Sequence, residues 1–147
     1  MEFNASFDQL ENETLKLVLI GKNHGNDAEI PYYYYSIILK KKNVEIGKIS
    51  VRIGHNKHSY YNGNLGYEIN EEYRGNKHSL AAAKLVLQVA EFHKMQYLHV
   101  SCNESNIASA TIIELLGAKL LEIVKPPKEY VFYNENMEKQ RIYLLNL

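Results

Sequence analysis

The chain has 147 residues, enough for one domain with a substantial hydrophobic core and too few for two comfortable ones. Its 17 lysine and arginine residues balance its 17 aspartate and glutamate residues, so the net charge provides no broad field that would direct it to nucleic acid or to an anionic membrane. Cys102 is the only cysteine, which excludes an intramolecular disulfide bond and is typical of the reducing cytoplasm.

The N-terminal segment does not resemble a targeting signal. Acidic residues stand where a signal peptide carries a basic and then an apolar stretch, and no window approaches the roughly 20 apolar residues of a membrane span. We therefore expect a cytoplasmic protein with no membrane and no nucleic-acid partner. No linker, repeat or low-complexity tail supports a second domain, so we expect a single domain over residues 1–147.

The first half of the chain predicts β-strands. Residues 15–20 form a short apolar run that ends in a cluster of turn-forming residues. Residues 32–54 contain two β-rich runs separated by the sequence KKKN, which predicts a hairpin with a solvated basic turn. The tyrosines at 32–35 would alternate between the two faces of a strand, so we interpret them as sheet packing rather than as an aromatic ligand platform. After a polar turn region at 55–64, residues 65–69 predict another strand.

The second half of the chain alternates helices with strands. After Ser79, polar residues recur at spacings of four and three among apolar ones, which predicts a largely buried helix over 80–94. A second helix after residue 106 is predicted to place Ala108, Ile112 and Leu115 along one face. Further strands are predicted over 95–102, 118–124 and 140–147.

The order of these elements defines the fold class. The second helix is predicted to end at Gly117, which stands where a left-handed C-terminal residue is favoured. Strands at the start of the chain are followed by strand, helix, strand, helix and two further strands. This order predicts a mixed α/β or α+β domain built on one central sheet.

The segment with the clearest chemical potential is RGNKHS, residues 74–79, which lies between a predicted strand and a predicted helix. A helix N-terminus presents unpaired backbone N–H groups and the positive end of the helix dipole, so this turn suits a pyrophosphate. The side chains of Arg74, Lys77, His78 and Ser79 could add charge and hydrogen bonds. Many strand-to-helix turns contain Arg and Gly and bind nothing, so this spacing alone leaves the site open.

Two blocks of sequence resemble a known family. GYEINEEYRGNKHSLAAAKLVLQVAEF, followed by CNESNIASATIIELLGAKLLEIV, resembles the GNAT family of acyl-CoA-dependent N-acetyltransferases, over roughly residues 35–147. The arrangement of Asn103, Asn106 and Ser109 is most similar to the branch that includes ribosomal-protein N-terminal and small-amine acetyltransferases. The resemblance implies a mixed, mostly antiparallel central sheet with flanking helices and a splayed strand pair that forms the acyl-CoA cleft.

The resemblance also implies a cofactor site. The family's arginine or glutamine matches Arg74, its first glycine matches Lys77 and its second glycine or alanine matches Ser79, so the backbone amides of about Asn76 to Ser79 would bind the CoA pyrophosphate. A side chain at Lys77 is costly if φ must be positive there, but a lysine could also pair with a phosphate. The expected residues are Ile69, Asn70, Arg74, Gly75, Asn76, Lys77, His78, Ser79, Asn103 and Asn106.

By the same resemblance, strands 65–69 and 97–102 splay apart, so that the pantetheine arm of CoA can pair with free backbone groups near Ile69 and Asn70. Unpaired N–H and C=O groups at a strand edge are ready partners for an amide-containing arm. Asn103 and Asn106 would line the wall of this cleft. A structural role is equally open, because Ser105 or Asn106 could cap the second helix.

Acetyl transfer requires a neutral amine, stabilisation of the oxyanion and protonation of the departing thiolate. An alkyl amine has a pKa of about 10.4, so a base or a water relay must take its proton. Glu68 is our candidate base, because burial beside the thioester would raise the pKa of its carboxyl group. The alternatives are a solvated strand residue and an ion-pair partner for Arg52.

The source of the thiolate's proton is less evident. Many family members carry a tyrosine at the position that matches Ile113, which has no proton to give. Related branches carry a serine that corresponds to Ser109, and Tyr130, Tyr133 and Tyr143 are further candidates from the C-terminal region. The missing tyrosine also favours the alternative of a catalytically silent acyl-CoA-binding or interaction module.

No metal site is predicted. His55 and His58 have metal-like spacing in a polar loop, but two further ligands are missing nearby in the sequence. Cys102 could in principle form an acyl-enzyme, although a lone cysteine on a sheet face is more often a small inert hydrophobe. Direct attack in a ternary complex is therefore the simpler mechanism.

The sequence thus predicts an N-acetyltransferase that uses acetyl-CoA as co-substrate and a primary amine as acceptor. The acceptor is either a small molecule or a protein N-terminus. Its pocket is expected to come from loops 21–31, 54–64 and 126–139, because variable loops carry specificity in such folds. The oligomeric state, including a homodimer, is open at this level.

Overall fold

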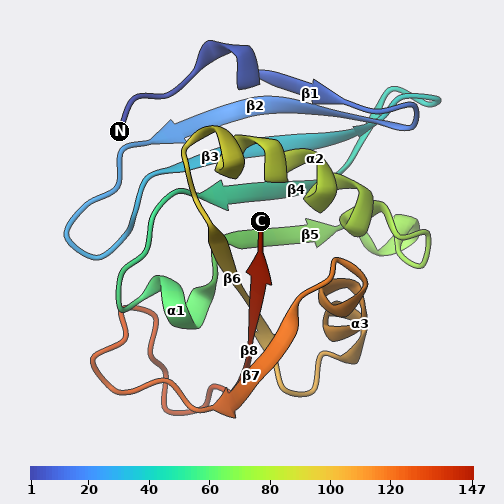
Figure 1. Ribbon diagram of the computed structural model, residues 1–147. Helices are drawn as coiled ribbons and strands as arrows, with labels where there is room; N and C mark the ends of the chain where they lie inside the picture. Colours follow the sequence, from blue (N-terminus) through green and yellow to red (C-terminus); the bar gives the residue numbers. More distant parts are fainter.

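The computed structural model describes all residues 1–147 (Figure 1). The strands form two antiparallel sheets, one of five strands in the order β1-β2-β3-β4-β5 and one of three in the order β6-β8-β7. The elements are β1 (Gln9–Glu11), β2 (Leu15–Asn23), β3 (Tyr32–Leu39), β4 (Val44–Arg52), α1 (Ser59–Asn62), β5 (Leu65–Ile69), α2 (His78–Phe92), β6 (Tyr97–Asn103), α3 (Ile107–Leu115), β7 (Lys119–Val124) and β8 (Gln140–Asn146), with 3-10 turns at Ala5–Phe7 and Glu71–Tyr73.

The five-stranded sheet follows the expected alternation of side chains. Tyr33 and Tyr35 are fully buried on the face that meets the core, whereas Tyr32 and Tyr34 are half-buried on the other face. The buried hydroxyl of Tyr35 donates to the carbonyl oxygen of Phe7 at 2.7 Å, which satisfies its polar atom. The prediction that the tyrosine run serves sheet packing is therefore confirmed.

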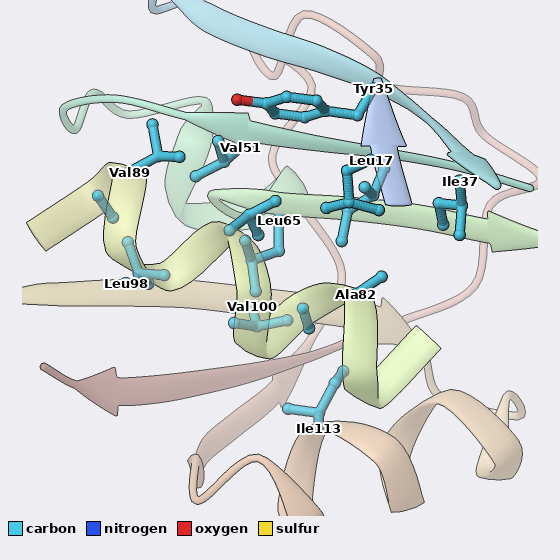
Figure 2. Packing of buried hydrophobic residues seen from close by; sticks show 14 of the residues in the cluster. Leu17, Tyr35, Ile37, Val51, Leu65, Ala82, Val89, Leu98, Val100 and Ile113 are labelled. Carbon is cyan, nitrogen blue, oxygen red and sulfur yellow. The ribbon is translucent and has the colours of Figure 1, made fainter. Parts of the chain in front are cut away.

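Helix α2 covers one face of this sheet (Figure 1). Small residues on its inner side, Ala82, Ala83 and Ala90, are fully buried and let the helix approach the strands closely. The two sheets and α2 share a single cluster of 25 buried hydrophobic residues. Figure 2 shows its centre, with Leu17, Tyr35, Ile37, Val51, Leu65, Ala82, Val89, Leu98, Val100 and Ile113.

The sheets meet at Asn64, which is fully buried at the start of β5. Its amide donates to the carbonyl of His99 in β6 at 2.6 Å, and its side-chain oxygen accepts from the amide of His99 at 2.9 Å. The side-chain nitrogen donates to the carbonyls of Arg52 and Gly54. Beyond this junction β5 and β6 are not hydrogen-bonded, so the expected splayed pair is present and the expected single sheet is divided in two.

Helix α3 has Ala108, Ile112 and Leu115 along one face, as predicted, and this face lines a groove, whereas Ala110 and Ile113 are buried in the core. The periodicity identified an apolar face but not what covers it, because a ligand groove and a core select similar residues. The polar region 55–64 also contains the one-turn helix α1. No helix of the chain combines the length and the apolar character required to cross a bilayer.

Candidate functional site

A groove of about 610 Å³ lies where the end of β5, the turn after it and α3 come together. It is bounded on one side by the first turn of α2 and on the other by the outward face of α3. Its lining residues are Tyr67, Glu68, Ile69, Tyr73, Arg74, Gly75, Lys77, His78, Ser79, Asn106, Ala108, Ser109, Thr111, Ile112 and Leu115.

The turn before α2 has the backbone geometry of an anion site. Lys77 occupies the N-cap position with φ 58° and ψ 27°, in the left-handed region that a side chain disfavours. No side chain caps the helix, and the first turn carries no acidic residue. The amides of His78, Ser79 and Leu80 have no acceptor within the chain, so their N–H groups and the helix dipole are free to bind an anion.

Not all residues of the expected cofactor site line the groove. Asn76 is exposed, and its side chain makes only long contacts of 3.5 Å with backbone carbonyls. Asn70 is also exposed and donates to the carbonyl of Glu45 at 3.4 Å. Asn103 lies outside this groove as well. The expected residues that do line it are Ile69, Arg74, Gly75, Lys77, His78, Ser79 and Asn106.

Along β5, the main-chain N–H and C=O groups of successive residues point alternately toward β4 and toward the gap between β5 and β6. The amide of Asn70 donates to the carbonyl of Ile46 at 2.7 Å, so Asn70 offers no free N–H. Tyr67 and Ile69 have the opposite parity and direct their main-chain groups toward the gap. The carbonyl of Ile69 accepts from Nε of Arg74 at 2.8 Å. The free edge therefore consists of the main-chain groups of Tyr67 and the N–H of Ile69, rather than of groups on Ile69 and Asn70.

A second cavity, of about 330 Å³, lies between β5 and β6. It shares Tyr67, Asn106 and Ser109 with the groove, so these three residues stand between the two spaces. No charged side chain lines the second cavity. Its remaining lining residues are Tyr61, Asn62, Leu65, Gly66, Ser101, Cys102, Asn103, Tyr130 and Gln140.

The two asparagines before α3 have structural contacts. The side-chain oxygen of Asn106 accepts from the amide of Ser109 at 3.1 Å, so Asn106 is the N-cap of this helix. The side-chain oxygen of Asn103 accepts from Nε2 of Gln140 at 2.7 Å. Asn106 thus caps α3 and also lines both cavities, so it has both the capping role and the cleft-lining position that the sequence left open.

Glu68 does not have the environment expected of a buried base. Its side chain is exposed, and Glu68 lines the groove but not the second cavity. The alternative ion pair with Arg52 is also absent, because the Arg52 guanidinium donates to the carbonyls of Asn62 and Gly63 instead. Strand alternation explains this position, since Glu68 points to the face opposite Tyr67.

Among the hydroxyl groups, only some reach the cavities. Tyr143 is buried and its hydroxyl donates to Glu114 at 3.1 Å, away from both spaces. Tyr133 lines neither space, whereas Tyr130 lines the second cavity. Ile113 is packed in the core.

The sequence reasoning missed Tyr67. Its hydroxyl lies 2.8 Å from Oγ of Ser109, and burial raises the pKa of its phenol while this hydrogen bond opposes the rise. The signal that could have identified it is strand parity, because Tyr67 has the same orientation as the buried residues of β5. Its distance from Ser109 could not have been inferred, since the two residues are 42 positions apart.

The residues considered for metal binding or covalent catalysis have other roles. Nδ1 of His58 accepts from the amide of Val131 at 3.1 Å, and the ring of His55 stacks on Tyr97 with centroids 4.3 Å apart. No group of three or more potential metal ligands is present. Cys102 is buried, and this burial raises the pKa of its thiol, which favours an inert thiol.

Comparison with known proteins relates this architecture to acyl-transfer enzymes. The sequence model described as "Acetyltransferase (GNAT) domain" matches residues 7–119. No curated protein sequence matched the chain.

Solved structures share the fold at low sequence identity. A Vibrio cholerae protein provisionally described as a ribosomal-protein-serine acetyltransferase has a TM-score of 0.69 at 15% identity, and the match covers 95% of this chain and 97% of that one. The ribosomal-protein-S5-alanine acetyltransferase of Vibrio fischeri has a TM-score of 0.62 at 19% identity, with 78% and 62% covered. Microcin C7 self immunity acetyltransferase MccE, in complex with acetyl-CoA and AMP, has a TM-score of 0.61 at 18% identity, with 79% and 61% covered. The match thus spans less than two thirds of the latter two proteins.

Proposed function

The chain belongs to the GNAT family of acetyltransferases, and from this premise we propose that it transfers the acetyl group of acetyl-CoA to a primary amine by direct attack in a ternary complex. The observation that carries the proposal is the pair of adjoining cavities. One has free helix-terminal amides suited to a pyrophosphate, and the other is neutral and suited to an amine. The two spaces meet at Tyr67, Asn106 and Ser109, where the thioester would lie.

The cofactor would extend along the groove. Its pyrophosphate would accept hydrogen bonds from the amides of His78 to Leu80, with Lys77 and Arg74 supplying positive charge. Its pantetheine arm would pair with the free edge at Tyr67 and Ile69. A main-chain N–H at this edge could then stabilise the oxyanion that forms on the thioester carbonyl.

The neutral second cavity bears on the class of amine. No carboxylate lines it, so no local base would remove a proton from a strongly basic amine. An α-amino group has a pKa of about 7.7–8.0 and is roughly a tenth neutral at pH 7, whereas a lysine side chain is neutral in well under about one molecule in a thousand. We therefore propose an α-amino acceptor, on a protein N-terminus or a small molecule, whose proton passes to water rather than to Glu68.

A competition between two peptides tests this proposal. One peptide has a free N-terminus and arginine in place of lysine, and the other has a blocked N-terminus and one lysine. With acetyl-CoA, mass spectrometry should show acetylation of the first at least about tenfold faster than of the second. A preference for the lysine peptide would overturn the α-amine assignment.

The alternative of a catalytically silent acyl-CoA-binding module has its own signature. The observation that favours it is the absence of a hydroxyl at Ile113. Such a module would be stabilised against thermal unfolding by acetyl-CoA, and a screen of amines would release no free CoA thiol. Stabilisation together with thiol release that depends on an α-amine would exclude it.

A further inference from the structure

The three loops expected to form the acceptor pocket meet near Arg52, the last residue of β4. Nδ2 of Asn56 donates to the carbonyl of Ala28 at 2.8 Å, which joins the loop after β4 to the loop after β2. The amide of Val131 donates to Nδ1 of His58 at 3.1 Å, which joins the loop after β7 to the loop after β4. Arg52 lines a small cavity together with residues of the first two of these loops.

The guanidinium of Arg52 is a partly buried charge without an ion-pair partner. Its Nη1 donates to the carbonyls of Asn62 at 3.3 Å and Gly63 at 2.9 Å, whereas Nε and Nη2 have no hydrogen-bond partner in the chain. Glu29 lines the same small cavity, but the two side chains form no ion pair. Burial lowers the pKa of the guanidinium, because a charge removed from water is costly. It nevertheless stays protonated at neutral pH, so a bound anion would offset this cost.

The unpaired nitrogen Nη2 lies beside the second cavity. A Cβ atom at Gly66 would lie 3.1 Å from Nη2, and Gly66 itself lines that cavity. Because glycine has no side chain, nothing at position 66 separates Nη2 from the second cavity. The small cavity beside Arg52 has a volume of only about 10 Å³, roughly the room of one water molecule. A larger anion would therefore approach the guanidinium through the second cavity.

Tyr130 provides a second donor at this place. It lines the second cavity, and the charge of Arg52 acts on its phenol. Burial raises the pKa of the phenol to about 12, although Arg52 opposes the rise. The phenol therefore retains its proton at neutral pH and can donate it in a hydrogen bond. An arginine fork and a neutral hydroxyl together suit a carboxylate.

The distance to the reaction point limits where the acceptor carries this carboxylate. Gly66 directly precedes Tyr67, at whose main-chain edge the thioester would lie. Consecutive Cα atoms are about 3.8 Å apart, so Nη2 of Arg52 lies within roughly 10 Å of the reacting carbonyl. An extended peptide advances about 3.3–3.6 Å per residue. An acidic side chain on the first or second residue of a peptide can therefore span the distance.

We propose that Arg52, assisted by Tyr130, binds a carboxylate of the acceptor, so that the preferred acceptor is a peptide α-amine with an acidic residue at its first or second position. The inference rests on the proposed acetyl transfer and names the class of acceptor for the same site. Nε and Nη2 can bind both oxygens of the carboxylate. An amide of the same shape would leave the charge of Arg52 unpaired, which is the source of the selectivity.

The first test measures binding without turnover. Peptides that differ only in Glu or Gln, at the first or at the second residue, are titrated calorimetrically into the wild-type protein with CoA in place of acetyl-CoA. At one of the two positions the Glu peptide should bind at least about fivefold more tightly than its Gln counterpart. Equal affinities within both pairs, or no binding of either acidic peptide, would overturn the carboxylate site.

The same peptides with acetyl-CoA separate this inference from the proposed function. Preferential binding of an acidic peptide without release of CoA thiol would sink the transfer reaction and leave the carboxylate site standing. Thiol release at equal rates from the acidic peptides and their Gln counterparts would do the reverse.

Substitutions then assign the selectivity to Arg52. Arg52→Gln should reduce the preference for Glu over Gln to less than about twofold, and Arg52→Lys, which keeps the charge but loses the fork, should retain part of it. Lys57→Gln is the matched control, because it removes an exposed cation from the loop after β4 that lines neither the groove nor the second cavity. Arg52 also holds two carbonyls of the chain, so melting temperatures verify that each variant is folded. A full preference in Arg52→Lys and Arg52→Gln, or its loss in Lys57→Gln, would contradict the assignment.

Discussion

At the scale of single residues, Lys77 combines an unfavourable backbone with a useful charge. Its φ of 58° is a conformation that glycine adopts without strain and that other residues adopt at a cost of about 1 kcal/mol or more. Its side chain lines the groove that we propose for acetyl-CoA, where an ammonium group would attract a phosphate. Under this proposal, the chain carries local strain at a position where a charge would contribute to anion binding.

The strain and the charge of Lys77 can be separated by two substitutions. Lys77→Gly should raise the free energy of unfolding by about 0.5 kcal/mol, because relief of strain exceeds the added chain entropy of glycine. It should also weaken acetyl-CoA binding about fivefold, since one exposed charge is lost. Lys77→Gln removes the charge but keeps the strain, so it should weaken binding similarly without raising stability. Denaturant unfolding and calorimetric titration measure both quantities, and equal stability of the two variants would contradict the strain argument.

At the scale of elements, the separation of β5 from β6 creates the space for the candidate site. Asn64 ties the two strands together at one point, and beyond it neither strand has a partner on the facing side. The gap that results provides both the free edge at Tyr67 and the second cavity. A single continuous sheet would have paired these groups and left no room for an amide-containing arm.

The junction can be tested with two neighbouring asparagines. Asn64→Ala removes three side-chain hydrogen bonds and leaves buried main-chain groups unpaired, so it should lower the free energy of unfolding by about 2–4 kcal/mol. Asn62→Ala is the control, because its buried side-chain oxygen has no hydrogen-bond partner. We expect that variant to lose less than about 1 kcal/mol. Similar losses of unfolding free energy in both variants, measured by chemical denaturation, would show that the hydrogen bonds of Asn64 do not hold β5 and β6 together.

At the scale of the whole molecule, stability should depend on pH through three partly buried histidines. Burial lowers the pKa values of His55, His93 and His99 from the ordinary value of about 6.5. The folded state thus binds fewer protons than the unfolded state in this range. Their neutral forms stabilise the fold fully above about pH 6.5, and this contribution is lost as the pH falls through the lowered values.

The melting temperature should therefore fall between about pH 7.5 and about pH 5.5. His99, whose Nδ1 is buried without a partner, is the most informative of the three to replace. His99→Gln should flatten the dependence on pH, whereas His24→Gln, at an exposed position, should leave it unchanged. A melting temperature that rises toward acid, or an equal slope in wild type and His99→Gln, would contradict this assignment.

Elements that depend on interactions between residues close in sequence were predicted well, and features that depend on contacts between distant segments were not. The strand at Leu65–Ile69 was predicted with its observed bounds, and the helices at His78–Phe92 and Ile107–Leu115 were predicted within about two residues, because periodicity and caps are local signals. The short strand Gln9–Glu11 was missed, since three residues carry no period. The burial expected for Glu68 was not found, because strand parity places it on the face opposite Tyr67 and Ile69, which pack toward the core.

The sequence by itself determined the family, the α+β class and the position of the turn before α2, because each of these depends on residues that are neighbours along the chain. Only the tertiary structure decided where β5 and β6 separate, and which residues of the expected site line the groove. It alone decided that Tyr67 meets Ser109 at hydrogen-bond distance. The physical reason is that these features depend on contacts between elements far apart in sequence, which are fixed by the packing of the whole core rather than by any local pattern.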